Sequence, residues 1–251
     1  MVKLEVCVDT LESALAAAEG GASRLELCTG LDLGGLTPST GLIGSVIDTT
    51  QVPVHVLIRP RAGDFCYSPQ ELAIMETDIE QARSLGAAGV VFGVLTPVGA
   101  VDVKSMRRLI LAAHDMKVTC HRAFDLTADA FEALGTLLDI GVHYLLTSGQ
   151  AATAVEGIGL LRELVERSGD RLTVMPGGGI DSTNAGLLTG ETGAVWLHAS
   201  ARSSYAGPMS FRREAVTMGR AGQDEYSRSR TDAGQVRSII LAAQSVRRVL
   251  P

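Results

Sequence analysis

Short apolar runs alternate with amphipathic segments along the whole chain, and this alternation limits the possible folds more than any other feature. Eight runs have the length and character of buried strands: Leu4–Val8, Arg24–Cys28, Val54–Arg59, Val90–Leu95, Lys117–Arg122, Tyr144–Ser148, Leu172–Met175 and Ala194–Ala199. Helical patterns follow them at about 10–19, 39–49, 69–85, 102–114, 127–138, 153–167, 182–188 and 236–250. Strands that alternate with helices predict a parallel sheet. Eight repeats in 251 residues favour a closed (β/α)8 barrel of the TIM type over an open doubly wound sheet.

The chain shows no linker, so residues 1–251 are predicted to form a single α/β domain. Residues 201–230 are rich in Arg, Ser and Gly and have no clear period. This pattern predicts a long loop before the C-terminal helix, of the kind that forms a lid or binding loop or stays disordered. The short helix at 182–188 would leave part of the barrel thinly covered, where a partner subunit could pack.

Composition excludes several classes of protein. Hydrophobic residues make up 46% and charged residues 20%, as in a globular protein with a large core. The net charge of −6 and the 4% of aromatic residues argue against a nucleic-acid partner. No apolar stretch is long enough for a membrane span, and the N-terminus does not read as a signal peptide. We therefore expect a cytoplasmic protein whose four cysteines are reduced.

Polar side chains share one face of the first two strands. Glu5, Cys7 and Asp9 alternate with apolar residues on the first, and Glu26 and Cys28 do so on the second. Neighbouring strands would then aim carboxylates and thiols in one direction. A strand cysteine is most often a small buried hydrophobe. Two cysteines on adjacent strands make a soft-metal site the alternative.

The other strand ends contribute further polar residues to the barrel mouth, which is the functional face of such barrels. They are His55, Arg59, Arg61, His121, Arg122, Asp125, Ser148 and His198. Buried carboxylates need partners, and the simplest arrangement pairs Glu5 and Glu26 with Arg59 or Arg122 inside the barrel. A strand histidine is usually a hydrogen-bonded core residue. The functional alternatives are acid–base chemistry at His121, or a divalent metal held by histidine together with Glu26.

A glycine run after the seventh strand suggests an anion site. Glycines let the backbone approach an anion, and the following helix N-terminus supplies N–H donors. The loops after strands seven and eight of such barrels often hold phosphate, although tight turns also use glycine for geometry alone. The predicted anion- or phosphate-binding residues are Arg59, Arg61, Ser148, Gly177, Gly178 and Gly179.

Motifs along nearly the whole chain resemble the CutC copper homeostasis family. They are Leu4–Cys7, Arg24–Cys28, Gly34–Ser39, His55–Arg61, Gly63–Phe65, Val90–Leu95, His121–Asp125, Leu146–Gln150, Pro176–Gly179 and His198–Ser200. The resemblance implies a cytoplasmic (β/α)8 barrel that forms homo-oligomers, dimers or tetramers. It also implies Cu(I) bound through cysteine thiolates, which Cys7 and Cys28 would supply here.

Two functional hypotheses follow from these residues. The leading one is a copper homeostasis protein that binds Cu(I) through Cys7 and Cys28. The alternative is an enzyme acting on a small phosphorylated or anionic metabolite, with His121 as general acid or base and Glu26 or Glu5 as its partner. The copper hypothesis and the enzyme hypothesis are both correct if the bound metal takes part in catalysis. A third reading, a non-catalytic oligomeric scaffold, predicts no ligand.

Overall fold

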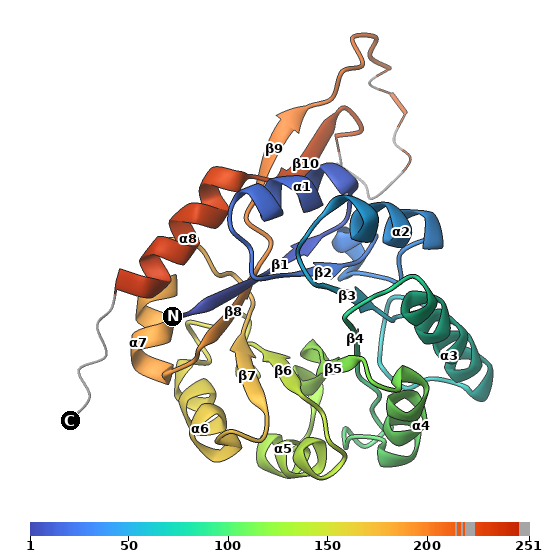
Figure 1. The fold of residues 1–251 in the computed structure, drawn as a ribbon, viewed down its shortest axis with the longest axis vertical. Helices are drawn as coiled ribbons and strands as arrows, with labels where there is room; N and C mark the ends of the chain where they lie inside the picture. Colours follow the sequence, from blue (N-terminus) through green and yellow to red (C-terminus); the bar gives the residue numbers. More distant parts are fainter. Residues whose placement is uncertain (214, 217, 219–223, 246–251) are drawn as a thin grey trace.

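A barrel of parallel strands surrounded by helices forms the body of the protein (Figure 1). The computed structural model describes residues 1–213, 215–216, 218 and 224–245. In this part of the chain, eight strands form one sheet in the order β7-β6-β5-β4-β3-β2-β1-β8. The sheet closes where Gly177, just after β7, forms a parallel bridge with His198 of β8. The predicted (β/α)8 barrel is confirmed.

The elements lie close to the predicted ranges. The barrel strands are β1 (Lys3–Val8), β2 (Arg24–Leu27), β3 (Val54–Leu57), β4 (Gly89–Phe92), β5 (Lys117–Cys120), β6 (Tyr144–Thr147), β7 (Thr173–Pro176) and β8 (Trp196–Ala199). The helices are α1 (Leu11–Glu19), α2 (Thr40–Thr49), α3 (Pro69–Ser84), α4 (Val103–Ala113), α5 (Ala130–Asp139), α6 (Ile158–Ser168), α7 (Ala185–Thr192) and α8 (Ala233–Ser245). The helix predicted at 182–188 starts later because Asp181 first forms a turn, accepting hydrogen bonds from the backbone N–H and hydroxyl of Thr183.

Capping side chains start several of these helices. The side chains of Thr10, Ser39 and Asp129 each accept a hydrogen bond from a first-turn backbone N–H. At α3, Ser68 and Glu71 form a reciprocal capping box. Such caps satisfy N–H groups that have no partner within the helix. The strand-to-helix loops at the barrel mouth are thereby fixed where they enter their helices.

The described part of residues 201–230 differs from the prediction of a loop without regular structure, and residues 214, 217 and 219–223 lie outside that part. β9 (Arg202–Ala206) and β10 (Ser227–Thr231) pair antiparallel and extend from the barrel beside α1 (Figure 1). Glu12 of α1 forms an ion pair with Arg230 and accepts a hydrogen bond from the Tyr205 hydroxyl at 3.2 Å. Both strands are polar on each face, so they lack the alternation that marks a half-buried strand. The last predicted helix ends at Ser245 in the described part, and residues 246–250 lie outside it.

The main apolar core lies between the barrel and its helices. Its fully buried side chains include Leu25, Leu27, Val56 and Leu145 from the strands. A smaller apolar cluster at the mouth contains Cys7, Cys28, Leu57 and Val91. In the described residues, no helix is long and apolar enough to cross a membrane.

Candidate functional site

Strand register brings the polar residues of β1, β2 and β8 together inside the barrel. Glu5 lies opposite Arg24 of β2 on one side and opposite His198 of β8 on the other. Cys7 lies opposite Glu26. Side chains that are 193 residues apart in sequence therefore meet at one place, because β8 returns to pair with β1.

Glu5 is fully buried between two cationic partners. Arg24 forms an ion pair with one carboxylate oxygen, and His198 Nδ1 lies 2.9 Å from the other. Burial alone would raise the pKa of Glu5, but Arg24 and His198 together lower it to about 2. The Arg24 guanidinium also lies over the rings of Tyr144 and Trp196, at 4.1 and 4.4 Å from their centroids. Glu5 is therefore ionised and paired deep in the barrel.

A mixed set of possible metal ligands lies one layer closer to the mouth. Cys7, Glu26 and His198 each offer a ligand atom, and these atoms lie within 4.8 Å of one another. His198 Nε2 is 3.6 Å from a Glu26 oxygen. Burial would lower the pKa of His198, but Glu26, Cys7 and Glu5 raise it well above its usual value. The imidazole is thus protonated between two carboxylates in the absence of a metal.

The thiols of Cys7 and Cys28 face each other at this level. Their sulfur atoms are 3.7 Å apart, and the Cys28 thiol also lies 3.6 Å from the Val8 carbonyl oxygen. Cys28 is fully buried, and Cys7 is 6% exposed. The hydrogen bond with Cys28 and burial raise the pKa of Cys7 well above its usual value. Both cysteines are free, so the structure holds a buried pair of thiols.

A pocket of about 180 Å³ opens over this cluster. Its charged and polar lining comes from Cys7, Glu26, Arg59, His121, Arg122 and His198, and its apolar lining from Leu31, Leu57, Phe65 and Leu146, with Gly34 completing it. Residues predicted from five different strand ends therefore share one small cavity. A mostly apolar cavity with a few convergent polar groups is the usual form of a ligand site.

His121 contributes a neutral imidazole to this pocket. Its Nδ1 accepts a hydrogen bond from the Ala123 N–H at 3.2 Å, so the proton of the neutral ring is on Nε2. Burial and the charge of Arg59 lower the pKa of His121 to about 4. Nε2 is buried and has no hydrogen-bond partner among the described residues. Its predicted acid–base partnership with Glu26 or Glu5 stays a prediction, since no hydrogen bond joins them in this part of the chain.

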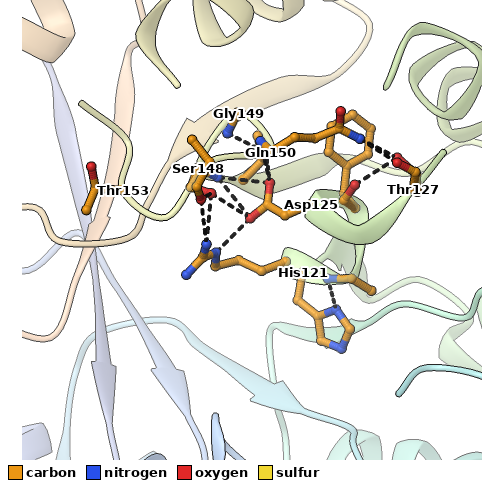
Figure 2. A network of polar contacts seen from close by, with 12 residues as sticks. His121, Asp125, Thr127, Ser148, Gly149, Gln150 and Thr153 are labelled. Atoms are coloured by element: carbon orange, nitrogen blue, oxygen red, sulfur yellow. Dashed lines mark hydrogen bonds and ion pairs between the residues drawn. The ribbon is translucent and has the colours of Figure 1, made fainter. Parts of the chain in front are cut away.

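Asp125 organises the polar network beside His121 (Figure 2). Its carboxylate accepts hydrogen bonds from the Thr147 hydroxyl, from the Ser148 N–H and hydroxyl at 3.1 and 2.9 Å, and from the Gln150 N–H at 3.2 Å. It also forms an ion pair with Arg122 at 2.7 Å. The network ties the 3₁₀ turn after β5 to the loop after β6, and it neutralises Arg122. Sequence reasoning placed Asp125 at the mouth but did not find this role.

The glycine run after β7 is held close to the same network. Gly177 donates its N–H to the Thr147 carbonyl at 2.9 Å. Gly178 and Gly179 have φ angles of 103° and 73°, which L-residues rarely adopt, and a Cβ on Gly178 would lie 3.3 Å from Arg122 Nη1. Backbone geometry is sufficient to explain these glycines, so phosphate binding at Gly177–Gly179 stays a prediction.

Arg59 is anchored by backbone carbonyls, and its predicted anion binding stays a prediction. It donates to the carbonyl oxygens of Leu33, Gly35 and Gly63 at 2.9 to 3.0 Å. The expectation that Arg59 or Arg122 pairs with Glu5 is wrong, because Arg24 takes that position from the adjacent strand. Arg59 instead fixes the loops after β2 and β3 around the pocket.

Two other predicted residues lie outside the pocket lining. Arg61 pairs with Glu71 at 2.5 Å and with Asp64 at 3.0 Å, within the loop that leads into α3. His55 is buried deeper in the barrel, where its Nδ1 lies 3.3 Å from the Thr119 hydroxyl. Burial and Arg24 lower the pKa of His55 to about 3. The contacts of Arg61 and His55 are therefore structural.

Comparison with known proteins identifies the family of this chain. The profile of the CutC family matches residues 2–203. A family protein CutC of Chromobacterium violaceum is 48% identical over 94% of this chain and 96% of its own length. The human copper homeostasis protein cutC homolog is 44% identical over 97% of this chain and 89% of its own length. A crystal structure of CutC from Streptococcus agalactiae, 32% identical, superposes with a TM-score of 0.76 over 80% of this chain and 99% of that one. The chain belongs to the CutC family.

Proposed function

We propose that this protein acts in copper homeostasis by binding Cu(I) between the thiolates of Cys7 and Cys28. The observation that carries the proposal is the sulfur–sulfur distance of 3.7 Å between two free, buried cysteines. Thiolates are soft ligands that select Cu(I), and Cu(I) accepts as few as two or three ligands. Little movement of the two side chains is needed to bring both sulfur atoms onto one ion.

The surroundings of the thiols fit a monovalent soft ion. Leu57 and Val91 form an apolar cluster with Cys7 and Cys28. His198 belongs to the same ligand-distance cluster as Cys7, so its imidazole can supply a third donor once a proton leaves. Access runs through the pocket, because Cys7 lines it while Cys28 lies beneath.

Copper affinity should rise with pH. The pKa of Cys7 lies well above its usual value, so binding must displace its proton. The affinity for Cu(I) is expected to increase by about tenfold per pH unit for each proton displaced. Competition titrations at pH 6, 7 and 8 measure this slope, and a pH-independent affinity would contradict thiol deprotonation.

The direct test is an anaerobic titration of the full chain with Cu(I) against a coloured competing chelator. Wild-type protein should take up one equivalent, and Cys7→Ser and Cys28→Ser should each lose it while keeping the circular dichroism of the fold. Cys66→Ser is the matched control, since Cys66 is a free, partly exposed thiol outside the pocket. Retention of the site in the Cys7→Ser/Cys28→Ser double variant would refute the proposal.

A second pair of variants separates the two donor sets that share Cys7. The thiol pair predicts that Cys28→Ser abolishes Cu(I) binding whereas Glu26→Gln preserves it. The mixed set of Cys7, Glu26 and His198 predicts the reverse. The second pattern would point to a site with oxygen and nitrogen donors, which suits harder divalent ions.

We further infer a reducing, cytoplasmic setting, because the proposed chemistry needs Cys7 and Cys28 as thiols. Cell fractionation with an antibody to the native protein tests this location.

We also propose a homo-oligomer, because the short helix α7 leaves part of the barrel thinly covered, where a partner subunit could pack. Sedimentation velocity tests the oligomeric state. A monomer at micromolar concentration would rule it out.

A further inference from the structure

A second group of residues in the pocket is not used by the copper proposal. Arg59 is 6% exposed, and its Nη atoms donate to the backbone carbonyl oxygens of Leu33, Gly35 and Gly63. No Asp or Glu among the described residues forms an ion pair with it. A buried guanidinium with neutral partners alone is unfavourable, because its charge is removed from water without a counter-charge. Arg59 lines the pocket, so an anion bound there would supply that charge.

His121 provides an unpartnered donor in the same cavity. It is 6% exposed and lines the pocket, and no described residue accepts a hydrogen bond from its Nε2. The Ala123 N–H fixes the tautomer by donating to Nδ1. Arg59 is close enough to shift the titration of this ring. Buried donors are normally satisfied, so an oxygen atom of a ligand is the missing acceptor.

The rest of the lining restricts the size and polarity of the ligand. Leu31, Leu57, Leu146 and Phe65 provide apolar surface. The Phe65 ring lies 4.9 Å from the His121 ring and 5.1 Å from the Arg59 guanidinium, so it adjoins both polar groups. The cavity of about 180 Å³ is smaller than the roughly 300–1,000 Å³ of sites for drug-sized molecules. The ligand therefore has only a few carbon atoms beside its charged group.

We propose that this pocket binds a small organic carboxylate, with its carboxylate group held by Arg59 and the Nε2–H of His121. The ligand class follows from charge: one uncompensated cation matches a monoanion, since Arg122 is already neutralised by Asp125. A phosphate monoester carries about −1.5 to −2 charge and three strong acceptor oxygens. Burying those oxygens against leucine and phenylalanine side chains would be unfavourable. This inference is independent of copper and gives the alternative enzyme hypothesis a ligand class.

The first test measures binding to the metal-free full chain by titration calorimetry and saturation-transfer NMR. The probes are acetate, lactate and succinate, with inorganic phosphate as the competing chemistry and sodium chloride at equal ionic strength as the blank. We expect at least one carboxylate to bind at one site per chain, and phosphate to bind at least tenfold more weakly. No carboxylate signal above the chloride blank, or preference for phosphate, would overturn the proposal.

Two histidine variants then locate the site. In His121→Asn the amide oxygen can still accept the Ala123 N–H, but the Nε2–H is lost, so carboxylate affinity should fall by tenfold or more. His143→Asn is the matched control, because His143 also accepts a backbone N–H through Nδ1 at 3.2 Å but lies outside the pocket. Arg59→Met should likewise abolish binding. If Arg59→Met does not fold, His121→Asn decides, and wild-type affinity in that variant refutes the site.

Discussion

At the scale of single residues, the barrel interior holds two histidines in opposite protonation states around one pocket. His198 is protonated between Glu5 and Glu26, whereas burial and Arg59 keep His121 neutral. Environments that separate the pKa values of like groups are typical of functional sites. Arg24 supports this arrangement because its ion pair fixes the Glu5 carboxylate, which in turn orients His198.

Glu5→Gln should therefore destabilise the fold strongly. The change leaves the Arg24 guanidinium buried without its counter-charge, and breaking a buried pair in this way costs about 3–5 kcal/mol. The exposed i,i+4 pair of Glu163 and Arg167 is the control, for which Glu163→Gln should cost no more than about 1 kcal/mol. Urea unfolding measures both, and equal costs would show that the Glu5 pair is not a structural requirement.

Acid should weaken the protein before its carboxylates titrate. The folded-state pKa values of His55 and His121 are about 3 and about 4, below the ordinary 6.5, so the unfolded chain binds more protons between these limits. The stability that these two rings contribute is then complete above pH 6.5 and falls as the pH decreases, by up to about 1.4 kcal/mol per pH unit for each histidine. The pKa of His198 is raised instead of lowered, so the stability that His198 contributes changes only above pH 6.5, outside this window.

Urea unfolding at pH 7, 6 and 5 tests this dependence. In His121→Asn, the slope of the unfolding free energy against pH should decrease by the amount that corresponds to about one bound proton. A free energy of unfolding that is unchanged between pH 7 and pH 5 would contradict the buried, neutral state of both rings.

At the scale of elements, the loops after the strands bring the site together. The loop between β2 and α2 crosses over Cys28 at Gly35, whose φ is 84°. A Cβ there would lie 2.7 Å from Leu57 Cδ2 and 3.6 Å from Cys28 Cβ. Arg59 binds the Gly35 carbonyl and so fixes the same crossing from β3. The position of this loop thus depends on one glycine and one buried arginine.

Gly35→Ala should destabilise the protein by about 1–3 kcal/mol, because alanine is strained at this φ and its methyl group meets Leu57. Gly135→Ala is the matched control. Gly135 lies within α5 with no atom near the added Cβ, so alanine there should stabilise by about 0.5–1 kcal/mol. Thermal and urea unfolding measure the sign of the stability change for each substitution. Two substitutions of the same sign would contradict the backbone assignment at Gly35.

At the scale of the whole molecule, the sequence predicted the architecture better than the site. The repeat of apolar runs and helical patterns indicated a barrel because periodicity is a local property. Register is not local, so the placement of Arg24 and His198 on either side of Glu5 could not be predicted. Arg24 begins a strand and gave no signal as a buried partner. The polar strands β9 and β10 lacked the alternation that would have marked them.

The central claim is that Cys7 and Cys28 hold one Cu(I) ion together. Copper K-edge X-ray absorption of the anaerobically loaded protein tests it most directly, because it counts the sulfur atoms bound to the metal. We predict two sulfur neighbours in wild-type protein and in Cys66→Ser, whereas Cys28→Ser should retain no copper with such a shell. A first shell of nitrogen and oxygen alone, or a spectrum unchanged by Cys28→Ser, would contradict the claim.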